Sequence, residues 1–166
     1  MGHMDKSRAM GYNFHNTQSN GDGWESTAMK MRVVLDEGAL MPRRAHPFDA
    51  GLDLFSREDA VIPARGSAIF DTGVHVEIPE GYAGFIKSKS GLNMKHDINS
   101  EGVIDAGYTG PIIVKLYNHG DTDFAIRRGD KLTQLVLLPI GLPELEQCDS
   151  LGETERGDGG FGSTGR

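Results

Sequence analysis

The sequence predicts an all-β fold, a jelly roll or distorted β-barrel, with one short helix and a flexible C-terminal arm. Apolar, β-prone runs of about four to six residues recur roughly every ten residues and are separated by turn signals, a spacing typical of sandwiches and barrels. Patterns with the helical period are nearly absent. The 23 glycines among 166 residues are about twice the usual share, which indicates many turns or close backbone approaches.

The expected elements begin at residue 31 and follow one another along the chain. Asp71-Thr72-Gly73 separates two of the runs, and Pro79-Glu80-Gly81 ends the second of them. A helix is expected only over residues 92–96, after Ser90-Gly91. In chain order, the expected strands cover residues 31–35, 68–70, 74–78, 82–86, 112–117, 124–126 and 135–138.

The two ends of the chain differ in composition from the body. Residues 1–28 are polar and without periodicity, and Gly2-His3-Met4 looks like an expression-vector remnant, so we expect a disordered extension or a tag. The body is expected to form one domain over residues 29–151. Residues 152–166 form a glycine-rich arm in which Phe161 is the only large apolar residue, so the arm cannot build a core of its own.

Composition excludes several classes of protein. A net charge of −7 argues against general nucleic-acid binding, which needs a basic face. The single Cys148 excludes an intramolecular disulfide framework and fits a cytoplasmic protein. No apolar run approaches the roughly 20 residues of a membrane span. His46, His75, His96 and His119 show no metal-ligand spacing, so a histidine metal site is not expected.

Two loop segments could carry chemistry. Residues 102–110 hold three glycines, and a hairpin there would present Asp105 and Tyr108 on a rim whose backbone amides and carbonyls can read a planar base. The simpler alternative is an ordinary hairpin in which Asp105 caps a turn. Residues 88–92 place two serines, Lys89 and a glycine at the expected helix start, where free N–H groups favour an anion. The simpler alternative there is N-capping by Ser90.

Three further features are less specific. Asp53 lies inside an apolar, strand-like run, where an acid is usually structural and hydrogen-bonded, with a metal-supporting role as the alternative. Residues 131–136, which begin with Lys131, are an ordinary strand entry in which Gln134 offers an amide donor. The arm combines Arg156 with hydroxyls and glycines, a composition that suits an anion-binding nest, whereas a disordered tail is the simpler interpretation.

Taken in order, five segments resemble the five motifs of the homotrimeric dUTPase family. The third and fifth of these motifs are the specific ones, and the resemblance spans residues 31–166. The segments are Ala50-Gly51-Leu52-Asp53-Leu54, Lys89-Ser90-Gly91-Leu92, residues 102–110, residues 131–136 and residues 156–165.

The resemblance implies a jelly-roll homotrimer that hydrolyses dUTP to dUMP and pyrophosphate with Mg²⁺, held mainly by the substrate phosphates and water. It implies that Asp105 activates the attacking water, that Tyr108 stacks under the deoxyribose and that Phe161 covers the uracil. Each site would lie between subunits and be closed by a neighbour's arm. Asp53 would not contact the substrate itself but would support the residues that do. The uracil edge would be read by Asn99, Gly102, Val103 and Ile104, and the phosphates would be held by Lys89, Ser90, Gly91, Gln134, Arg156, Gly162, Ser163 and Thr164.

Two positions depart from the family pattern. Lys89 stands where arginine usually precedes the serine, which keeps the charge but loses the bidentate fork. Pro111 stands where glutamate usually follows the last glycine of the third motif, which removes a backbone donor. Two alternative functions stay open: a dCTP deaminase, with or without dUTPase activity, and a dUTP-sensing regulatory module that binds a protein partner.

Overall fold

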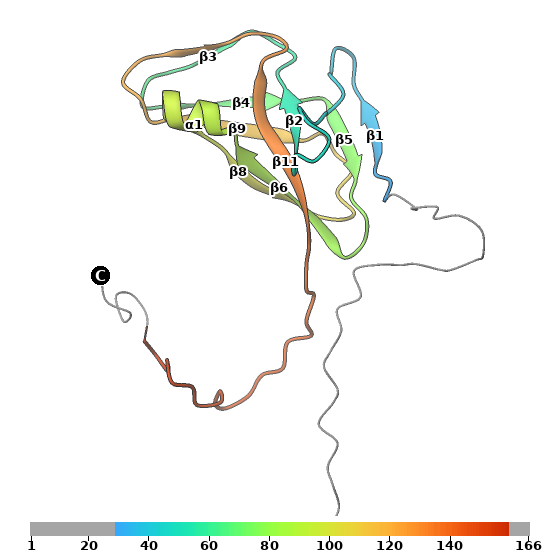
Figure 1. Cartoon of the computed structure of the whole chain (residues 1–166), viewed down its shortest axis with the longest axis vertical. Coiled ribbons are helices and arrows are strands. Elements are labelled where there is room, and N and C mark those ends of the chain that lie inside the picture. The colour runs from blue at the N-terminus through green and yellow to red at the C-terminus, as the bar shows by residue number, and fades with distance from the viewer. Residues whose placement is uncertain (1–28, 160–166) are drawn as a thin grey trace, which may run out of the picture. The chain divides into compact units, whose positions relative to one another are not determined.

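The computed structural model describes residues 29–159, in which eleven strands and one short helix follow one another (Figure 1). The chain divides into two units, Met1–Lys30 and Met31–Arg166, and the described elements all belong to the second. The elements are β1 (Arg32–Leu35), β2 (Gly51–Phe55), β3 (Ala60–Ile62), β4 (Ser67–Asp71), β5 (Val74–Glu77), β6 (Tyr82–Ser88), α1 (Ser90–His96), β7 (Ile98–Asn99), β8 (Glu101–Ile104), β9 (Ile113–Asn118), β10 (Phe124–Ile126) and β11 (Lys131–Pro139).

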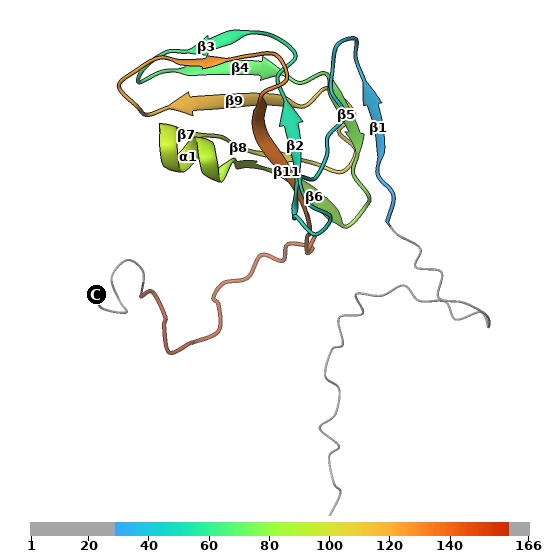
Figure 2. The same ribbon diagram turned by 45° about the horizontal axis from the view of Figure 1, so that its top comes forward.

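The strands form two main sheets and two smaller ribbons, and every described pairing is antiparallel. One main sheet has the order β2-β11-β6-β8 and the other has the order β4-β9-β7. The ribbons pair β1 with β5 and β3 with β10, as the view in Figure 2 allows the reader to follow. Most neighbouring strands in these sheets are far apart in the sequence, as in jelly rolls.

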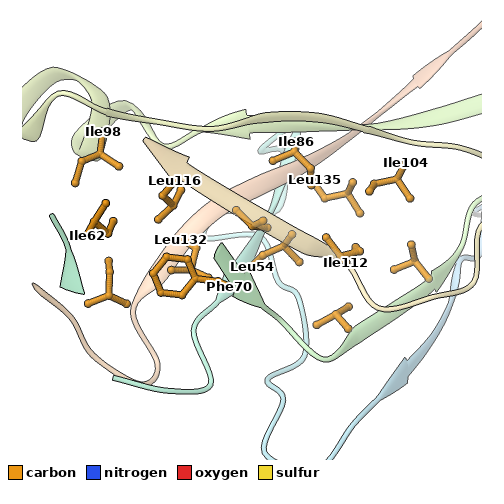
Figure 3. Close-up of a cluster of buried hydrophobic side chains, with 14 of the residues drawn as sticks. Leu54, Ile62, Phe70, Ile86, Ile98, Ile104, Ile112, Leu116, Leu132 and Leu135 are labelled. Atoms are coloured by element: carbon orange, nitrogen blue, oxygen red, sulfur yellow. The ribbon is translucent and has the colours of Figure 1, made fainter. Parts of the chain in front are cut away.

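A single apolar cluster fills the space between the two main sheets (Figure 3). Strand β9 shows how the sequence builds it: its residues alternate exposed and buried, so that Val114 and Leu116 face inward while Lys115 and Tyr117 face outward. The other main sheet contributes Leu54, Ile86 and Leu135, all at most 2% exposed. Burial on this scale is the main stabilising contribution to such a domain.

The predicted all-β class with one short helix is confirmed, and each expected strand is found to within a few residues. The helix begins two residues earlier than expected, at Ser90. Strands β3, β7 and β8 were not predicted. Strands of three and two residues, such as β3 and β7, carry too few alternating positions for a pattern to be read, and β8 was interpreted as part of the loop over residues 102–110.

The expected hairpin around residues 102–110 is wrong. Strand β8 pairs with β6 in one main sheet, whereas β9 pairs with β4 and β7 in the other. The segment between them therefore crosses from sheet to sheet instead of joining two paired strands. Its glycines and turn residues indicated a loop correctly, but they could not indicate which partners the flanking strands choose.

Within the described residues, no helix is both long enough and apolar enough to cross a membrane.

Candidate active site

The loop that follows β8 presents Asp105 to solvent. The chain turns at once after the strand, because the backbone N–H of Tyr108 donates to the Asp105 carbonyl over 3.1 Å. Gly107 has φ +95°, a conformation that side chains rarely adopt, so glycine is required there. Among the described residues, no side chain forms a hydrogen bond or ion pair with the exposed Asp105 carboxylate. That carboxylate is therefore free to accept a proton.

Tyr108 folds back over the end of the same loop. Its ring lies against Gly110, where an added Cβ would be 2.5 Å from the Tyr108 hydroxyl oxygen. The hydroxyl donates to the Pro111 carbonyl over 2.9 Å. Pro111 precedes β9 by two residues, so the missing N–H removes no bond from the sheet ladder. The departure at Pro111 therefore leaves the strand intact and keeps the backbone carbonyl that accepts the Tyr108 hydrogen bond.

Contacts with the start of β5 fix the far end of this loop. The Thr72 hydroxyl donates to the Ile112 carbonyl over 2.8 Å, and the Ile112 N–H donates to the Val74 carbonyl over 2.8 Å. Nδ1 of His75 lies 2.8 Å from the Thr109 carbonyl oxygen. Its other ring nitrogen, Nε2, lies 3.2 Å from Oδ1 of Asp36. These two partners raise the pKa of His75, the Thr109 carbonyl most, although partial desolvation opposes them.

A second cluster is built around the buried carboxylate of Asp53. Oδ1 lies 2.5 Å from Nζ of Lys89, and Oδ2 lies 2.7 Å from Nζ of Lys131. Burial raises the pKa of the Asp53 carboxyl, but the Lys131 and Lys89 ammonium groups outweigh it, so the net pKa lies below its usual value. The interpretation of Asp53 as a buried, partnered acid agrees with these contacts. The carboxylate positions two lysines and neutralises part of their charge.

Gln134 lies beside this cluster because β11 runs between β2 and β6. Its cross-strand partners are Asp53 on one side and Lys87 on the other, and its Nε2 donates to the Ser88 carbonyl over 3.1 Å. Gly51 makes room for its side chain, since a Cβ on Gly51 would lie 2.2 Å from Gln134 Oε1. Close approach is thus the reason for glycine at residue 51.

The start of α1 carries Ser90 and Gly91 next to Lys89. Lys89 is the N-cap residue, and its side chain makes no capping hydrogen bond. The alternative of N-capping by Ser90 is wrong, because Ser90 is already inside the helix. Both Ser90 and Gly91 are exposed, so a hydroxyl and free backbone N–H groups face outward beside the two lysines.

A groove of about 470 Å³ runs along this helix. Three lysines and one aspartate give its lining a net positive charge, and apolar side chains make up part of the same lining. Two of its lining residues, Lys89 and Gly91, belong to the predicted phosphate set. The lining residues are Lys89, Gly91, Leu92, Lys95, His96, Phe124, Ile126, Asp130 and Lys131.

The residues expected to read the base lie on β7 and β8. Gly102 and Val103 are exposed, whereas Ile104 faces the core and is 9% exposed. Asn99 is half-buried, and its Oδ1 lies 3.1 Å from Nε2 of His119. Both are edge strands of their sheets. Asp105 directly follows β8, whereas Asn99 is next to Ser100, which is bonded to Ser88 at the other end of β6.

The described part of the arm is exposed. Nε of Arg156 donates to the Gly159 carbonyl over 2.8 Å, and the N–H of Gly159 donates to the Arg156 carbonyl, so this stretch forms a compact turn. Phe161, Gly162, Ser163 and Thr164 lie outside the described residues.

The two clusters occupy opposite ends of β6. Ile104, next to Asp105, is paired with Gly84 near the start of that strand, whereas Lys89 follows its last residue, Ser88. Lys89 lies five positions after Gly84, so about 17 Å of extended chain lies between the ends. One chain therefore brings Asp53, Lys89, Ser90, Gly91 and Gln134 together, but not with Asp105 and Tyr108.

In the described part of the chain, no group of three or more His, Cys, Asp or Glu residues is placed to hold a metal ion. The Asp53 carboxylate already has two ammonium partners. Of the acids predicted for the site, Asp105 alone has a carboxylate without such a partner among the described residues.

Two residues of these clusters were not predicted from the sequence. Lys131 was read as part of an ordinary strand, yet it completes the pairing of Asp53. His75 was considered only as a metal ligand, yet it contacts the Asp105 loop. The place of Lys131 at the start of the motif segment 131–136 was a usable signal for the first, whereas nothing local in the sequence indicated the second.

An all-β scaffold with a lysine-rich cluster, an outward hydroxyl and an exposed carboxylate fits the class of hydrolases that act on phosphorylated substrates. The dUTPase family model matches residues 37–165. Deoxyuridine 5'-triphosphate nucleotidohydrolase of Arabidopsis thaliana is 46% identical over 147 residues, which is 88% of each chain. The chain belongs to the dUTPase family.

Solved structures agree with this assignment. The dUTPase of Staphylococcus bacteriophage 80alpha, solved with dUpNHpp, superposes with a TM-score of 0.78 at 34% identity, over 82% of this chain and 99% of that one. A mutant dUTPase of phage phi11 of S. aureus, described with a structural Mg(II) ion, superposes with a TM-score of 0.69 at 35% identity, over 74% and 98%.

Proposed function

We propose that this protein hydrolyses dUTP to dUMP and pyrophosphate by water attack on the α-phosphorus. The family match across residues 37–165, which includes an exposed and unpartnered Asp105, is the observation that carries the proposal. Removing dUTP keeps uracil out of DNA, and the dUMP product supplies dTMP synthesis. The curated relatives are named nucleotidohydrolases, which favours hydrolysis over dCTP deamination. The phage 80alpha dUTPase is described as controlling transfer of virulence genes, a role stated for that protein and not for this chain.

Asp105 acts as the base that orients and deprotonates the attacking water. Its carboxylate projects from a turn that Gly107 makes possible, and no described side chain competes for it. Phosphoanhydride hydrolysis needs little covalent assistance, so positioning and charge neutralisation carry most of the rate. A single fixed carboxylate is enough for the proton transfer.

The phosphates bind at the lysine-rich cluster. Lys89, Ser90, Gly91 and Gln134 bring an ammonium group, a hydroxyl, backbone N–H groups and an amide to one end of the β2-β11-β6 sheet. Asp53 holds Lys89 in place without contacting the substrate itself. Lys89 neutralises charge as a point cation, where arginine would make a bidentate contact. Arg156, with Gly162, Ser163 and Thr164, closes on the outer phosphates.

Magnesium fits this arrangement as an ion carried by the substrate. Mg²⁺ prefers oxygen ligands, retains several waters and is usually bound through phosphates with few protein carboxylates. With Asp53 paired to two lysines, Asp105 is the acid left to orient a water near such an ion. When bound, the ion would neutralise charge that develops on the phosphates.

Selectivity comes from the β7–β8 side of the site. Backbone groups of Gly102, Val103 and Ile104, together with Asn99, read the uracil edge and leave no space for a 5-methyl group. Tyr108 stacks under the deoxyribose and excludes a 2′-hydroxyl, while Phe161 covers the base. A site whose buried polar groups match one edge rejects other bases strongly, since mismatched groups stay unpaired.

A complete site needs more than one subunit. The Asp105 loop and the phosphate cluster lie at opposite ends of β6, roughly 17 Å apart along the strand, which is too far for one triphosphate to meet both from the same chain as described. A homotrimer resolves this separation by placing the Asp105 loop of one subunit against the phosphate cluster of the next. The arm of a neighbouring subunit then closes the site.

Pyrophosphate release tests the proposed activity. With Mg²⁺ present, we expect rapid release from dUTP and little from UTP, dTTP or dCTP. Equal rates on the four nucleotides would contradict the proposal, and ammonia release from dCTP would favour the deaminase alternative. Asp105→Asn should abolish turnover while dUpNHpp still binds; a fully active variant would refute the assigned base.

A further inference from the structure

We propose that the His75 imidazolium is a positioning residue for the Asp105 loop, acting as a clamp between the Thr109 carbonyl and the Asp36 carboxylate. This inference rests on the proposed function, because it assigns a role to the loop that carries the base. His75 contacts neither substrate nor water in this account; it acts through the loop.

The clamp lies at the point where the loop would otherwise be free. On the β8 side, Ile104 is paired with Gly84, which fixes the chain up to Asp105. On the β9 side, Ile112 is bonded to Val74. Between these anchors, His75 supplies the described side-chain contact that ties the loop to another strand, through the Thr109 carbonyl.

Both contacts together require the charged form of the ring. Nδ1 faces a carbonyl oxygen and Nε2 faces a carboxylate oxygen, and both of these partners only accept hydrogen bonds. The imidazolium donates from both nitrogens at once. A neutral ring has one N–H, so it keeps one partner and turns a lone pair toward the other. Deprotonation therefore weakens the clamp in either tautomer.

The charges around His75 favour this protonated form. The carboxylates of Asp36 and Asp71 favour the charged ring. Arg57 pairs with both of them, with Nη1 3.7 Å from Asp36 Oδ2 and Nη2 2.5 Å from Asp71 Oδ2. On the same face of the β1-β5 ribbon, Glu77 is paired with Arg32. The pKa of His75 is raised above its ordinary value of 6.5, so the clamp is complete below that pH and is lost as the pH rises through the raised pKa.

The effect on the reaction follows from position. Thr109 comes directly after the turn that begins at Asp105, and the Tyr108 ring between them rests on Gly110. Release of the Thr109 carbonyl loosens one side of that turn and with it the carboxylate. A base displaced by a fraction of an ångström loses rate more than it loses binding, so kcat should fall while KM changes little.

The first test compares the wild-type protein with His75→Gln across about pH 5.5 to about 9, a range that brackets histidine titration. Glutamine keeps an amide donor but cannot carry the charge. The ratio of the two kcat values cancels the ionisation of dUTP and of Asp105. We expect a ratio of about 10 at low pH, the usual effect of losing one charge-assisted hydrogen bond, falling toward about 1 above the pKa of His75.

The second test does not depend on activity. NMR titration of the His75 ring and of the backbone amides of residues 105–110 should give one shared midpoint in the wild-type protein, and the amide transition should vanish in His75→Gln. Asp36→Asn keeps the ring but removes its anionic partner, so it should move the midpoint to lower pH. The matched control is His46→Gln. His46 is exposed and its ring has no hydrogen-bond partner among the described residues, so this variant should behave as wild type.

Three outcomes would overturn the inference: loop amides that do not follow the His75 midpoint, a constant kcat ratio across the pH range, or an Asp36→Asn midpoint equal to that of the wild type. If the wild-type protein failed to hydrolyse dUTP, the proposed function would fall, while the NMR titration would still decide whether His75 clamps the loop. If His75→Gln did not fold, Asp36→Asn would supply the same decision.

Discussion

Replacing Asp53 by asparagine should destabilise the protein more than any surface ion pair does. The Asp53 side chain is 3% exposed and its carboxylate pairs with the ammonium groups of Lys89 and Lys131, whose side chains are 25% and 43% exposed. Breaking a buried pair costs about 3–5 kcal/mol, but these lysines can regain water, so we expect about 2–3 kcal/mol. For a chain of this length that corresponds to a fall in Tm of roughly 4–12 °C.

Thermal unfolding followed by circular dichroism measures this effect, and its pH dependence checks the cause. Because the folded pKa of Asp53 is lowered, its stabilisation is present above the ordinary carboxyl pKa and is lost as the pH falls through the lowered value. The gap between the wild type and Asp53→Asn should therefore close only in strong acid. The control is Asp121→Asn, whose ion pair with Arg65 is 66% and 82% exposed and should contribute less than about 1 kcal/mol. Equal Tm values for the two variants at neutral pH would refute the reasoning.

Three smaller changes have defined expectations. Gly51→Ala places a Cβ where the Gln134 amide lies, so steady-state kinetics should show KM for dUTP raised about tenfold, with a loss of stability of about 1–3 kcal/mol from overpacking; an unchanged KM would remove Gln134 from the phosphate site. Gly107→Ala strains a residue at φ +95° and should lower kcat at least several-fold, at a cost of about 1 kcal/mol measured by denaturant unfolding, whereas full activity would show that the turn is not needed. Tyr108→Phe removes the bond to the Pro111 carbonyl and should lower kcat/KM by about fivefold, and a rate equal to wild type would show that the ring alone is enough.

The sequence predicted those strands that are long enough to show a pattern of apolar residues. Strand β9 was predicted from its apolar run, but its inward face was not, because Ile113 and Tyr117 are exposed and Asn118 is buried. Strand β7 has two residues and β3 has three, and neither is long enough to show a period. Which strands pair with each other could not be predicted, for a different reason. Nothing in residues 102–110 indicates that β8 pairs with β6 while β9 pairs with β4, because the choice depends on packing between sheets.

The candidate site shows the same division. Asp53 was recognised as a buried, partnered acid from its apolar neighbours, and Gln134 from its motif. The ammonium partners of Asp53 come from two other strand ends, so their convergence required the structure. His75 was missed because its two partners lie 34 and 39 residues away along the chain. The distance between the Asp105 loop and the phosphate cluster could likewise not be predicted from the sequence, because it depends on the register of β6 and β8.

Mixed trimers test most directly the claim that dUTP is hydrolysed at a site shared between subunits. One variant, Asp105→Asn, lacks the base; the other, Ser90→Ala combined with Gln134→Ala, lacks two phosphate contacts. Each should be inactive alone. When the two are unfolded and refolded together in equal amounts, a site takes the base from one subunit and the phosphate contacts from the next, so about one site in four is intact. We predict recovery of about a quarter of the wild-type rate of pyrophosphate release from dUTP, and no recovery above either variant alone would contradict the account.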